Sequence, residues 1–421
     1  MLVTIIAFIL IFGILVLVHE YGHYYFAKRA GVLVREFSIG MGPKIWWQQR
    51  HGTTYTIRLL PVGGYVRLAG MDEDADQLRP GMPVTLQLND AQAVTLINTS
   101  DQPLRYPGIP VRVVDFDLVD GLWLEGYEND DETQVKRYAV DHDALLIERD
   151  GTQVRIAPRD VRFNSASLPH RMMINFAGAM NNFILALVLF IGLGFLMPKV
   201  PINTNQLGGV AKHSPAQVVG LQAGDKITAV GKQQVKNWDQ LTTTIAQTKD
   251  AQTTITYRRH GQLKRQAVKL KAVKQNGQRQ YQLGIYQAQS SKFADRMQYG
   301  WQMFARAGTL IFTALGQMMH GFSLNDLGGP VAIYATTSQA THFGFLGVVS
   351  FLAMLSINLG IMNLLPIPAL DGGKLLLNIV EAIIRRPIPA KFEGIVNLVG
   401  VVFLLILMLL VTFNDIQRYL M

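Results

Sequence analysis

The sequence predicts a multi-pass α-helical membrane protein with four transmembrane helices, a membrane-associated β-hairpin, a β-rich cytoplasmic insertion and one extracytoplasmic domain. Two observations lead to this fold class. First, 49% of the 421 residues are hydrophobic and only 16% are charged, whereas a soluble domain carries about 25% charged residues. Second, four stretches are apolar over the roughly 20 residues that a bilayer-spanning helix needs. Long parts of the chain are therefore expected to avoid water.

The four predicted spans divide the chain into alternating membrane and aqueous segments. They are residues 1–27, 171–198, 343–373 and 393–414. The first span does not resemble a cleaved signal peptide, because no basic segment precedes it and no small-residue cleavage site follows it. A fifth apolar stretch, residues 304–319, contains Arg306 and Gln317. We predict that it belongs to an interfacial amphipathic segment, residues 291–335, which lies on the membrane surface.

The charges that flank the first span predict its orientation. Seven Lys and Arg residues occur between positions 28 and 67, against a single acid, Glu36. The positive-inside rule then places the N-terminus outside and residues 28–170 in the cytoplasm. Arg385, Arg386 and Lys391, in the predicted cytoplasmic loop 374–392, agree with this orientation. The expected location is the plasma membrane of a bacterium, with residues 204–290 outside.

Composition also limits the chemistry. The chain has no cysteine, which excludes disulfides, thiolate metal ligands and a cysteine nucleophile. A net charge of +9 does not require a nucleic-acid partner, since basic span flanks and a basic extracytoplasmic domain account for it. Any metal site must therefore use His, Asp or Glu.

A metal-binding motif stands at the inner end of the first span. His19 and His23 are four residues apart, so on a helix both imidazoles face the same side. Together they can hold one Zn²⁺, while Glu20 can act as general base on a water molecule at the metal. An ordinary pair of helix-end histidines beside a glutamate would be the plainer interpretation. Placing these three residues after a long apolar run is costly, however, and favours a functional site.

A third ligand is expected because catalytic zinc commonly has three protein ligands. Asp371 follows the third span in the segment NLLPIPALDGG, residues 363–373, where two prolines end the helix and two glycines free the backbone. A capped loop after a span would explain the Pro and Gly residues but not the acid. With four spans, the first and third run in the same direction, so His19 and Asp371 reach the same membrane depth. This pairing requires residues 304–319 not to cross.

These motifs resemble those of the site-2 protease family. HEYGH in the first span, NLLPIPALDGG in the third and a PDZ-like module at residues 204–290 occur in the family's order, most similarly to the regulator-of-sigma-E proteases. The single module and the enlarged cytoplasmic region resemble the Gram-positive pheromone-processing and anti-sigma-cleaving members. The resemblance implies that His19, His23 and Asp371 bind Zn²⁺, that Glu20 activates water, and that Asn358 and Asn363 help to bind the substrate. The family's proline is absent from the segment 177–182, AGAMNN.

A membrane-spanning substrate must be unwound before cleavage, because its helix hides the backbone amides. Residues 53–69 read as two β-rich runs around the turn 61–64, and the family has a membrane-associated hairpin within the segment 28–71. An edge of this hairpin, with Tyr65, Val66 and Arg67, could accept the substrate as an added strand. Alternatively, the hairpin packs on the cytoplasmic domain.

Two domains complete the prediction. Residues 72–170 open with an acidic run and read as a small β-rich accessory domain without a chemical motif. In the PDZ-like module, strands are expected near Thr253–Arg258 and Ala267–Leu270. The module could bind an exposed C-terminus or exclude bulky ectodomains by size, and both roles stay open.

The sequence thus predicts an intramembrane zinc endopeptidase. Its expected partners are membrane lipid and single-span substrates, such as pre-cleaved anti-sigma factors and remnant signal peptides, and no nucleic acid. The alternatives are a catalytically inactive PDZ scaffold, which would not need Glu20, and a metal-binding transporter, which would spread polar residues along several spans.

Overall fold

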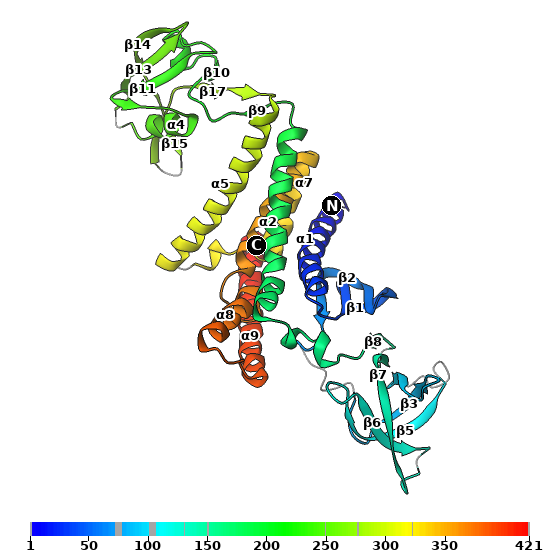
Figure 1. The fold of residues 1–421 in the computed structure, drawn as a ribbon. Helices are drawn as coiled ribbons and strands as arrows, with labels where there is room; N and C mark the ends of the chain where they lie inside the picture. Colours follow the sequence, from blue (N-terminus) through cyan, green and yellow to red (C-terminus); the bar gives the residue numbers. More distant parts are fainter. Residues whose placement is uncertain are drawn as a thin grey trace. The chain divides into compact units, whose positions relative to one another are not determined.

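The computed structural model contains four helices long and apolar enough to cross a membrane (Figure 1). It describes residues 2–71, 78–100, 107–129, 131–149, 151–248, 250–275, 278–321 and 323–419. The candidate membrane helices are α1 (Leu2–Arg29), α2 (Leu168–Leu196), α7 (Gly344–Asn363) and α9 (Ala390–Tyr419). Each corresponds to a predicted span. The acidic run at 72–76 lies outside the described residues.

The chain divides into two compact units. The first comprises residues 1–186 and 307–421, and the second comprises residues 187–306. The long helix α5 (Phe293–His320) is not among the candidate membrane helices of the described chain. Its position at the membrane surface stays a prediction. The short helix α6 (Pro330–His342) contacts α1, α7 and α9 and so lies among the candidate spans.

Helix α6 begins at a buried carboxylate. Asp415, near the end of α9 and 1% exposed, accepts hydrogen bonds from the backbone N–H groups of Gly329 and Ala332 at 2.9 and 3.0 Å. A carboxylate at a helix N-terminus satisfies otherwise unpaired amides and favours the helix dipole. This contact fixes α6 against α9.

The predicted hairpin has a different pairing from the one expected. Strand β1 (Val34–Arg50) pairs with β2 (Thr53–Leu68), and Ile39 pairs with both Ile57 and Gly64. The two β-rich runs within 53–68 therefore lie on opposite sides of residues 34–39 and do not pair with each other. Residues 64–68 form an outer row of this sheet. The prediction was wrong about the partner because the polar residues of β1 hid its strand character.

The segment between β2 and α2 forms the predicted β-rich domain. Its six-stranded sheet has the order β4-β3-β5-β6-β7-β8, and an added parallel pairing of β4 with β7 closes it around an apolar core. The strands are β3 (Pro83–Leu88), β4 (Val94–Asn98), β5 (Ile109–Asp117), β6 (Trp123–Glu128), β7 (Val135–Ile147) and β8 (Gln153–Arg155). Alternating apolar residues point into this core, as expected for half-buried strands.

The domain at residues 204–290 has its own apolar core. The two expected strands are present and longer, as β13 (Gln252–Arg259) and β14 (Gln262–Lys269). They belong to a sheet of order β12-β11-β13-β14. The other elements are β9 (Val200–Pro201), β10 (Leu207–Val210), α3 (Pro215–Val218), β11 (Lys226–Val230), β12 (Gln233–Gln234), α4 (Trp238–Ala246), β15 (Lys271–Gln275), β16 (Gln278–Gln282), β17 (Ile285–Gln287) and β18 (Gln289–Ser290).

Part of the connection predicted at residues 374–392 is helical, and its position on the cytoplasmic side stays a prediction. Helix α7 ends at Asn363, and a new helix, α8 (Asp371–Ile384), begins at the predicted ligand. Leu375, Leu376, Ile379 and Ile383 recur at helical spacing in α8. That periodicity marks an amphipathic helix, which charge counting alone did not identify.

Candidate metal centre

The two histidines of the motif lie on one face of α1 and meet the acid at the start of α8. The Nε2 atoms of His19 and His23 are 3.3 Å apart, and each lies 3.3 Å from Oδ2 of Asp371. The three side chains are 12%, 13% and 16% exposed. Ligands at about 2.0–2.1 Å in a tetrahedral zinc site are separated by about 3.3 Å. The triangle therefore has the dimensions of one zinc site.

Helix α2 packs closely against α1 beside the two histidines, and Gly178 of α2 leaves the space that their imidazoles occupy. A Cβ atom on Gly178 of α2 would lie 2.4 Å from His23 Nε2 and 2.6 Å from His19 Cε1, well inside van der Waals contact. Only glycine permits this approach. Although the segment 177–182 lacks the family's proline, it continues regularly within α2.

Hydrogen bonds from α2 fix both imidazoles. His23 Nδ1 lies 2.8 Å from the carbonyl oxygen of Ile174, which can only accept, so Nδ1 carries the proton and Nε2 keeps its lone pair. The side-chain amide of Asn182 lies 3.0 Å from His19 Nδ1, and Asn182 is fully buried. The atom that faces Nδ1 is the amide nitrogen Nδ2, while Oδ1 of Asn182 is buried without a hydrogen-bond partner among the described residues. Exchanging the two amide atoms would let Oδ1 accept from Nδ1–H and would give His19 the same tautomer as His23. Such outer partners orient metal-binding histidines.

The acid is positioned by an irregular loop and an ion pair. Ala369 has a φ of 72°, a left-handed conformation that is costly for a residue with a side chain. A Cβ on Gly372 would lie 2.2 Å from the carbonyl oxygen of Leu365, so the loop can fold back onto α8 only over glycine. Arg171 of α2 donates to both carboxylate oxygens of Glu381 at 2.6 and 3.0 Å, which ties α8 to α2.

A cavity of about 310 Å³ opens at these residues. Besides the three candidate ligands it contains Glu20, the predicted base, together with Tyr65 and Val66 of β2. Glu20 is also close to the outer row of β2, since a Cβ on Gly64 would lie 3.6 Å from Glu20 Cγ. The structure thus brings the predicted base, the candidate ligands and the strand edge to one place.

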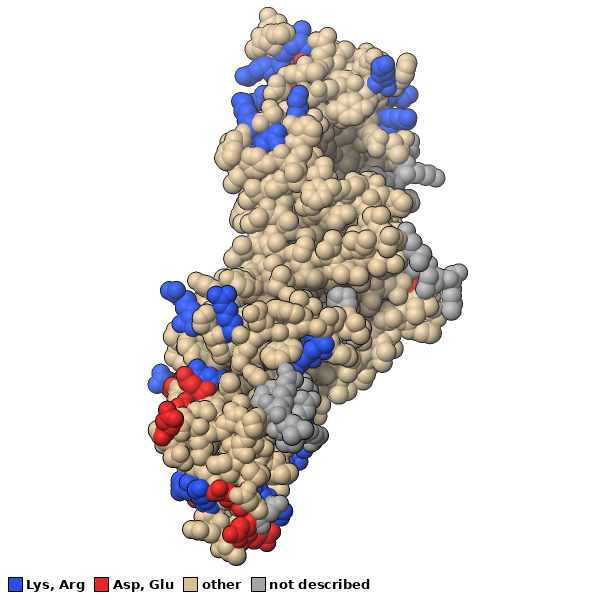
Figure 2. Space-filling model, turned by 90° about the vertical axis from the view of Figure 1, so that its right-hand side faces the viewer, with Lys and Arg blue, Asp and Glu red and all other residues tan. Residues whose placement is uncertain are grey.

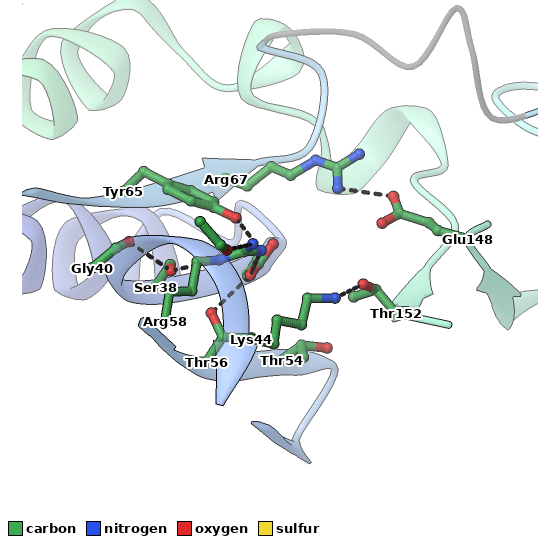
Figure 3. A network of polar contacts seen from close by, with 12 residues as sticks. Ser38, Gly40, Lys44, Thr54, Thr56, Arg58, Tyr65, Arg67, Glu148 and Thr152 are labelled. Carbon is green, nitrogen blue, oxygen red and sulfur yellow. Dashed lines mark hydrogen bonds and ion pairs between the residues drawn. The ribbon is translucent and has the colours of Figure 1, made fainter. Parts of the chain in front are cut away.

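Three predicted substrate-binding residues lie elsewhere. Asn358 and Asn363 are half-buried on α7 and do not line this cavity. The guanidinium of Arg67 forms a 2.8 Å ion pair with Glu148 of the six-stranded domain (Figure 3). None of the three is placed at the reacting centre.

Two further residues of the site were not singled out from the sequence. Asn182 contacts His19, and Lys374 lines the cavity one helical turn after Asp371. The signal for Asn182 was present, because adjacent amides within an apolar span are unusual. The signal for Lys374 was absent, since a lysine beside a span is common.

A helical HExxH motif whose histidines meet an aspartate, with a glutamate in the same cavity, is the arrangement of a zinc-dependent endopeptidase. Here it is built on helices apolar enough to cross a membrane. The family model described as "Peptidase family M50" matches residues 7–407. The chain therefore belongs to this family, the site-2 proteases, and is an intramembrane zinc metalloprotease.

Relatives match over nearly the whole length. "Probable protease eep" of Enterococcus faecalis is 49% identical over 418 residues, 99% of both chains. "Putative zinc metalloprotease LL2128" of Lactococcus lactis is 44% identical over 431 aligned residues, also 99% of both chains. Among solved structures, the PDZ domain of an SdrC-like protein from Listeria monocytogenes is 26% identical, covering 21% of this chain and 92% of its own, with a TM-score of 0.18.

Proposed function

We propose that His19, His23 and Asp371 hold the catalytic Zn²⁺ and that Glu20 is the general base. The observation that carries this proposal is the 3.3 Å triangle of ligand atoms. Oδ2 of Asp371 is buried and accepts no hydrogen bond from a described residue, so it is available to a cation. When bound, zinc supplies Lewis-acid activation of water and of the scissile carbonyl.

Glu20 moves the protons of the reaction. Its carboxylate takes a proton from the attacking water and delivers it to the leaving amine as the peptide bond breaks. The side chain shares the cavity with the ligands, which is the placement that this transfer requires. Ile174 acts through His23, because its carbonyl oxygen holds the proton on Nδ1 and leaves Nε2 unprotonated. Asn182 would do the same for His19 with its amide oxygen, in place of its nitrogen, facing Nδ1.

The outer row of β2 is proposed to bind the unwound substrate as an added strand. Tyr65 and Val66 line the cavity beside Glu20, so a strand paired with them would pass the reacting atoms. Large apolar side chains elsewhere on the β1–β2 sheet are exposed, which suits entry into the bilayer. They are Met41, Ile45, Trp46, Trp47, Ile57, Leu59 and Leu60.

A buried polar network stiffens this sheet (Figure 3). The Arg58 guanidinium donates to Glu36 and to the Tyr65 hydroxyl at 2.7 Å each and to Ser38 at 3.1 Å. Burial, followed by the nearby Glu36 carboxylate, raises the pKa of Tyr65 well above its usual value. The Tyr65 hydroxyl therefore stays neutral. Its hydrogen bond with Arg58 ties residues 64–68 to the rest of the sheet, while Tyr65 and Val66 line the cavity.

The proposed substrates are single-span membrane proteins, including pre-cleaved anti-sigma factors and remnant signal peptides. The proposed topology has the N-terminus and residues 204–290 outside and the metal centre toward the cytoplasm. Basic residues after α1 support this orientation. Cleavage at that depth reaches a substrate segment within or beside the bilayer.

The test compares wild type with Glu20→Gln in proteoliposomes containing a single-span substrate with a trimmed ectodomain. Because Gln is isosteric but cannot accept the proton, we expect unchanged zinc content and cleavage slower by about 1000-fold. His23→Ala serves as the matched control that should lose both zinc and cleavage. Wild-type cleavage by Glu20→Gln would refute the assignment.

A further inference from the structure

Residues 204–290 carry a charge that the protease chemistry does not use. The segment contains thirteen Lys and Arg residues against three Asp and no Glu, although the whole chain has a net charge of only +9. In Figure 2, blue side chains appear over this domain with little red among them, whereas both colours appear over the six-stranded domain. The excess positive charge of the protein is thus concentrated in one domain.

Part of this charge lies on one face of the four-stranded sheet. The basic face is defined here by Lys226, Lys232, Lys236, Arg258 and Arg265. All except Arg258 line a hollow of about 1090 Å³, and none of the described residues that line it is acidic. The hydroxyl groups of Thr254 and Thr256, both on β13, belong to residues that also line the hollow, whereas the Thr228 hydroxyl donates to the carbonyl oxygen of Thr256 at 3.2 Å. The surface offers cationic groups and hydroxyl donors together, which suits phosphate.

The strand register places like charges side by side. Lys226 is the direct partner of Arg258 across β11 and β13, and Arg265 of β14 is paired with Thr256 of β13. Directly opposed like charges destabilise a sheet. None of the five basic-face residues forms an ion pair with a described residue. An external anion would relieve this repulsion.

Arg259, the neighbour of Arg258, differs from the basic-face residues because an acid within the domain neutralises its charge. Arg259, whose side chain points to the other side of β13, donates to both carboxylate oxygens of Asp225 at 2.7 and 2.6 Å. One face of the strand is therefore paired internally, and the other is left positive. The difference indicates that the basic face serves a partner outside the chain.

Short connections hold this domain next to a candidate membrane helix. Only three residues separate the end of α2 from β9. At the start of α5, Arg296 donates to the carbonyl oxygens of the last residues of α2 and of the following turn, at 2.8–3.0 Å, which locks the two helices together. If α2 spans the membrane, the domain therefore begins close to the membrane surface.

A second contact brings the edge of the basic face to α5. Arg306 donates to Asp239 in the first turn of α4, at 2.7 and 2.8 Å. Lys236 lies directly before the cap of α4, Asn237. Arg306 also immediately precedes the apolar stretch 307–319 of α5. The edge of the basic face thus lies beside α5, the helix that we predict to lie on the membrane surface.

We propose that the basic face binds the phosphate headgroups of anionic lipids and so docks the domain on the membrane surface. This docking is independent of catalysis. A cationic surface is attracted by anionic headgroups within about one Debye length, with each Lys or Arg near the surface contributing.

The chain has no cysteine, so Gln262→Cys, at an exposed position that does not line the hollow, can be labelled uniquely with a fluorescent donor. Full-length protein is placed in nanodiscs that carry an acceptor on a headgroup, made from phosphatidylcholine with or without phosphatidylglycerol. We expect energy transfer to rise at least twofold with phosphatidylglycerol and to fall again in high salt. Equal transfer in both lipids would overturn the proposal.

Charge-removal variants test which residues are responsible. Lys226→Gln, Arg258→Gln and Arg265→Gln combined should abolish the response, since three charges shift docking on the order of 100-fold. The matched control is Lys212→Gln, Lys271→Gln and Lys292→Gln, three exposed charges off the face, which should keep most of it. An equal loss in both triples would refute the face as the site. Binding of soluble polyphosphate without any lipid response would assign the face to an anionic polymer and also refute the proposal.

Discussion

The proposed zinc ligands and the outer row of β2 line the same cavity, yet the structure holds them in different ways. The candidate ligands come from two helices, α1 and α8. Tight contacts at glycine residues and buried hydrogen bonds hold these helices and their side chains in place. The strand belongs to a small sheet whose large apolar side chains are exposed and whose stiffness comes from one polar network around Arg58. Packed helices form one side of the cavity. The other side is formed by residues 64–68, whose outer edge pairs with no other described strand.

This difference corresponds to two tasks. A metal site tolerates little displacement, because ligand distances must hold to within about 0.2 Å. A strand that accepts different substrates needs a row of backbone groups but few fixed side chains, since main-chain hydrogen bonds supply the affinity. Substitutions on the helical side should therefore act on zinc, and substitutions on the strand side should spare it.

Gly178→Ala should give the largest effect. The new Cβ would lie 2.4 Å from His23 Nε2, so the imidazole must move, and an overpacking cost near 3 kcal/mol corresponds to about 100-fold weaker zinc binding. Zinc content and cleavage should fall together. Gly192→Ala, on the same helix with no atom within 4 Å of its added Cβ, is the control and should behave as wild type. Full zinc occupancy in Gly178→Ala would contradict the tight packing.

Val66→Pro tests the strand side. Proline removes the backbone N–H and disrupts strand addition, so we expect cleavage to fall about 30-fold, the effect of losing one to two buried hydrogen bonds, while zinc content stays at the wild-type level. Val66→Ala keeps the N–H and should retain most activity. Loss of zinc in Val66→Pro, measured by metal analysis, would show that strand and metal centre are not separable.

Asn182→Ala should have the smallest effect, about a 10-fold loss of zinc affinity, as for other outer partners of metal-binding histidines. Asn182→Asp should restore affinity, because a carboxylate can accept from His19 Nδ1–H. Asn181→Ala is the control, since Asn181 donates to the backbone oxygen of Val18 and does not touch the histidine. If Asn182→Asp does not restore zinc affinity, the Asn182 amide donates to His19 Nδ1, and the tautomer assigned to His19 is wrong.

The sequence was sufficient for features that depend on local patterns. The spacing of His19 and His23 and the apolar length of the spans need no knowledge of distant residues. The pairing of β1 and β2 could not be predicted in the same way, because the partner of a strand depends on residues far along the chain. Helix α8 was not predicted for another reason: it lies between two spans and is followed by Arg385 and Arg386, a charge pattern typical of a connecting loop.

By itself, the sequence determined the class of chemistry, the candidate ligands and the number of apolar helices, since these follow from residue type and spacing. Only the tertiary structure decided that Asp371 lies 3.3 Å from both histidines, that Gly178 makes room for them, and that residues 64–68 form the edge beside Glu20. The physical reason is that such distances result from packing between helices and strands that lie far apart along the chain. The local sequence pattern indicates which groups belong to the site, whereas the tertiary structure brings those groups within bonding distance.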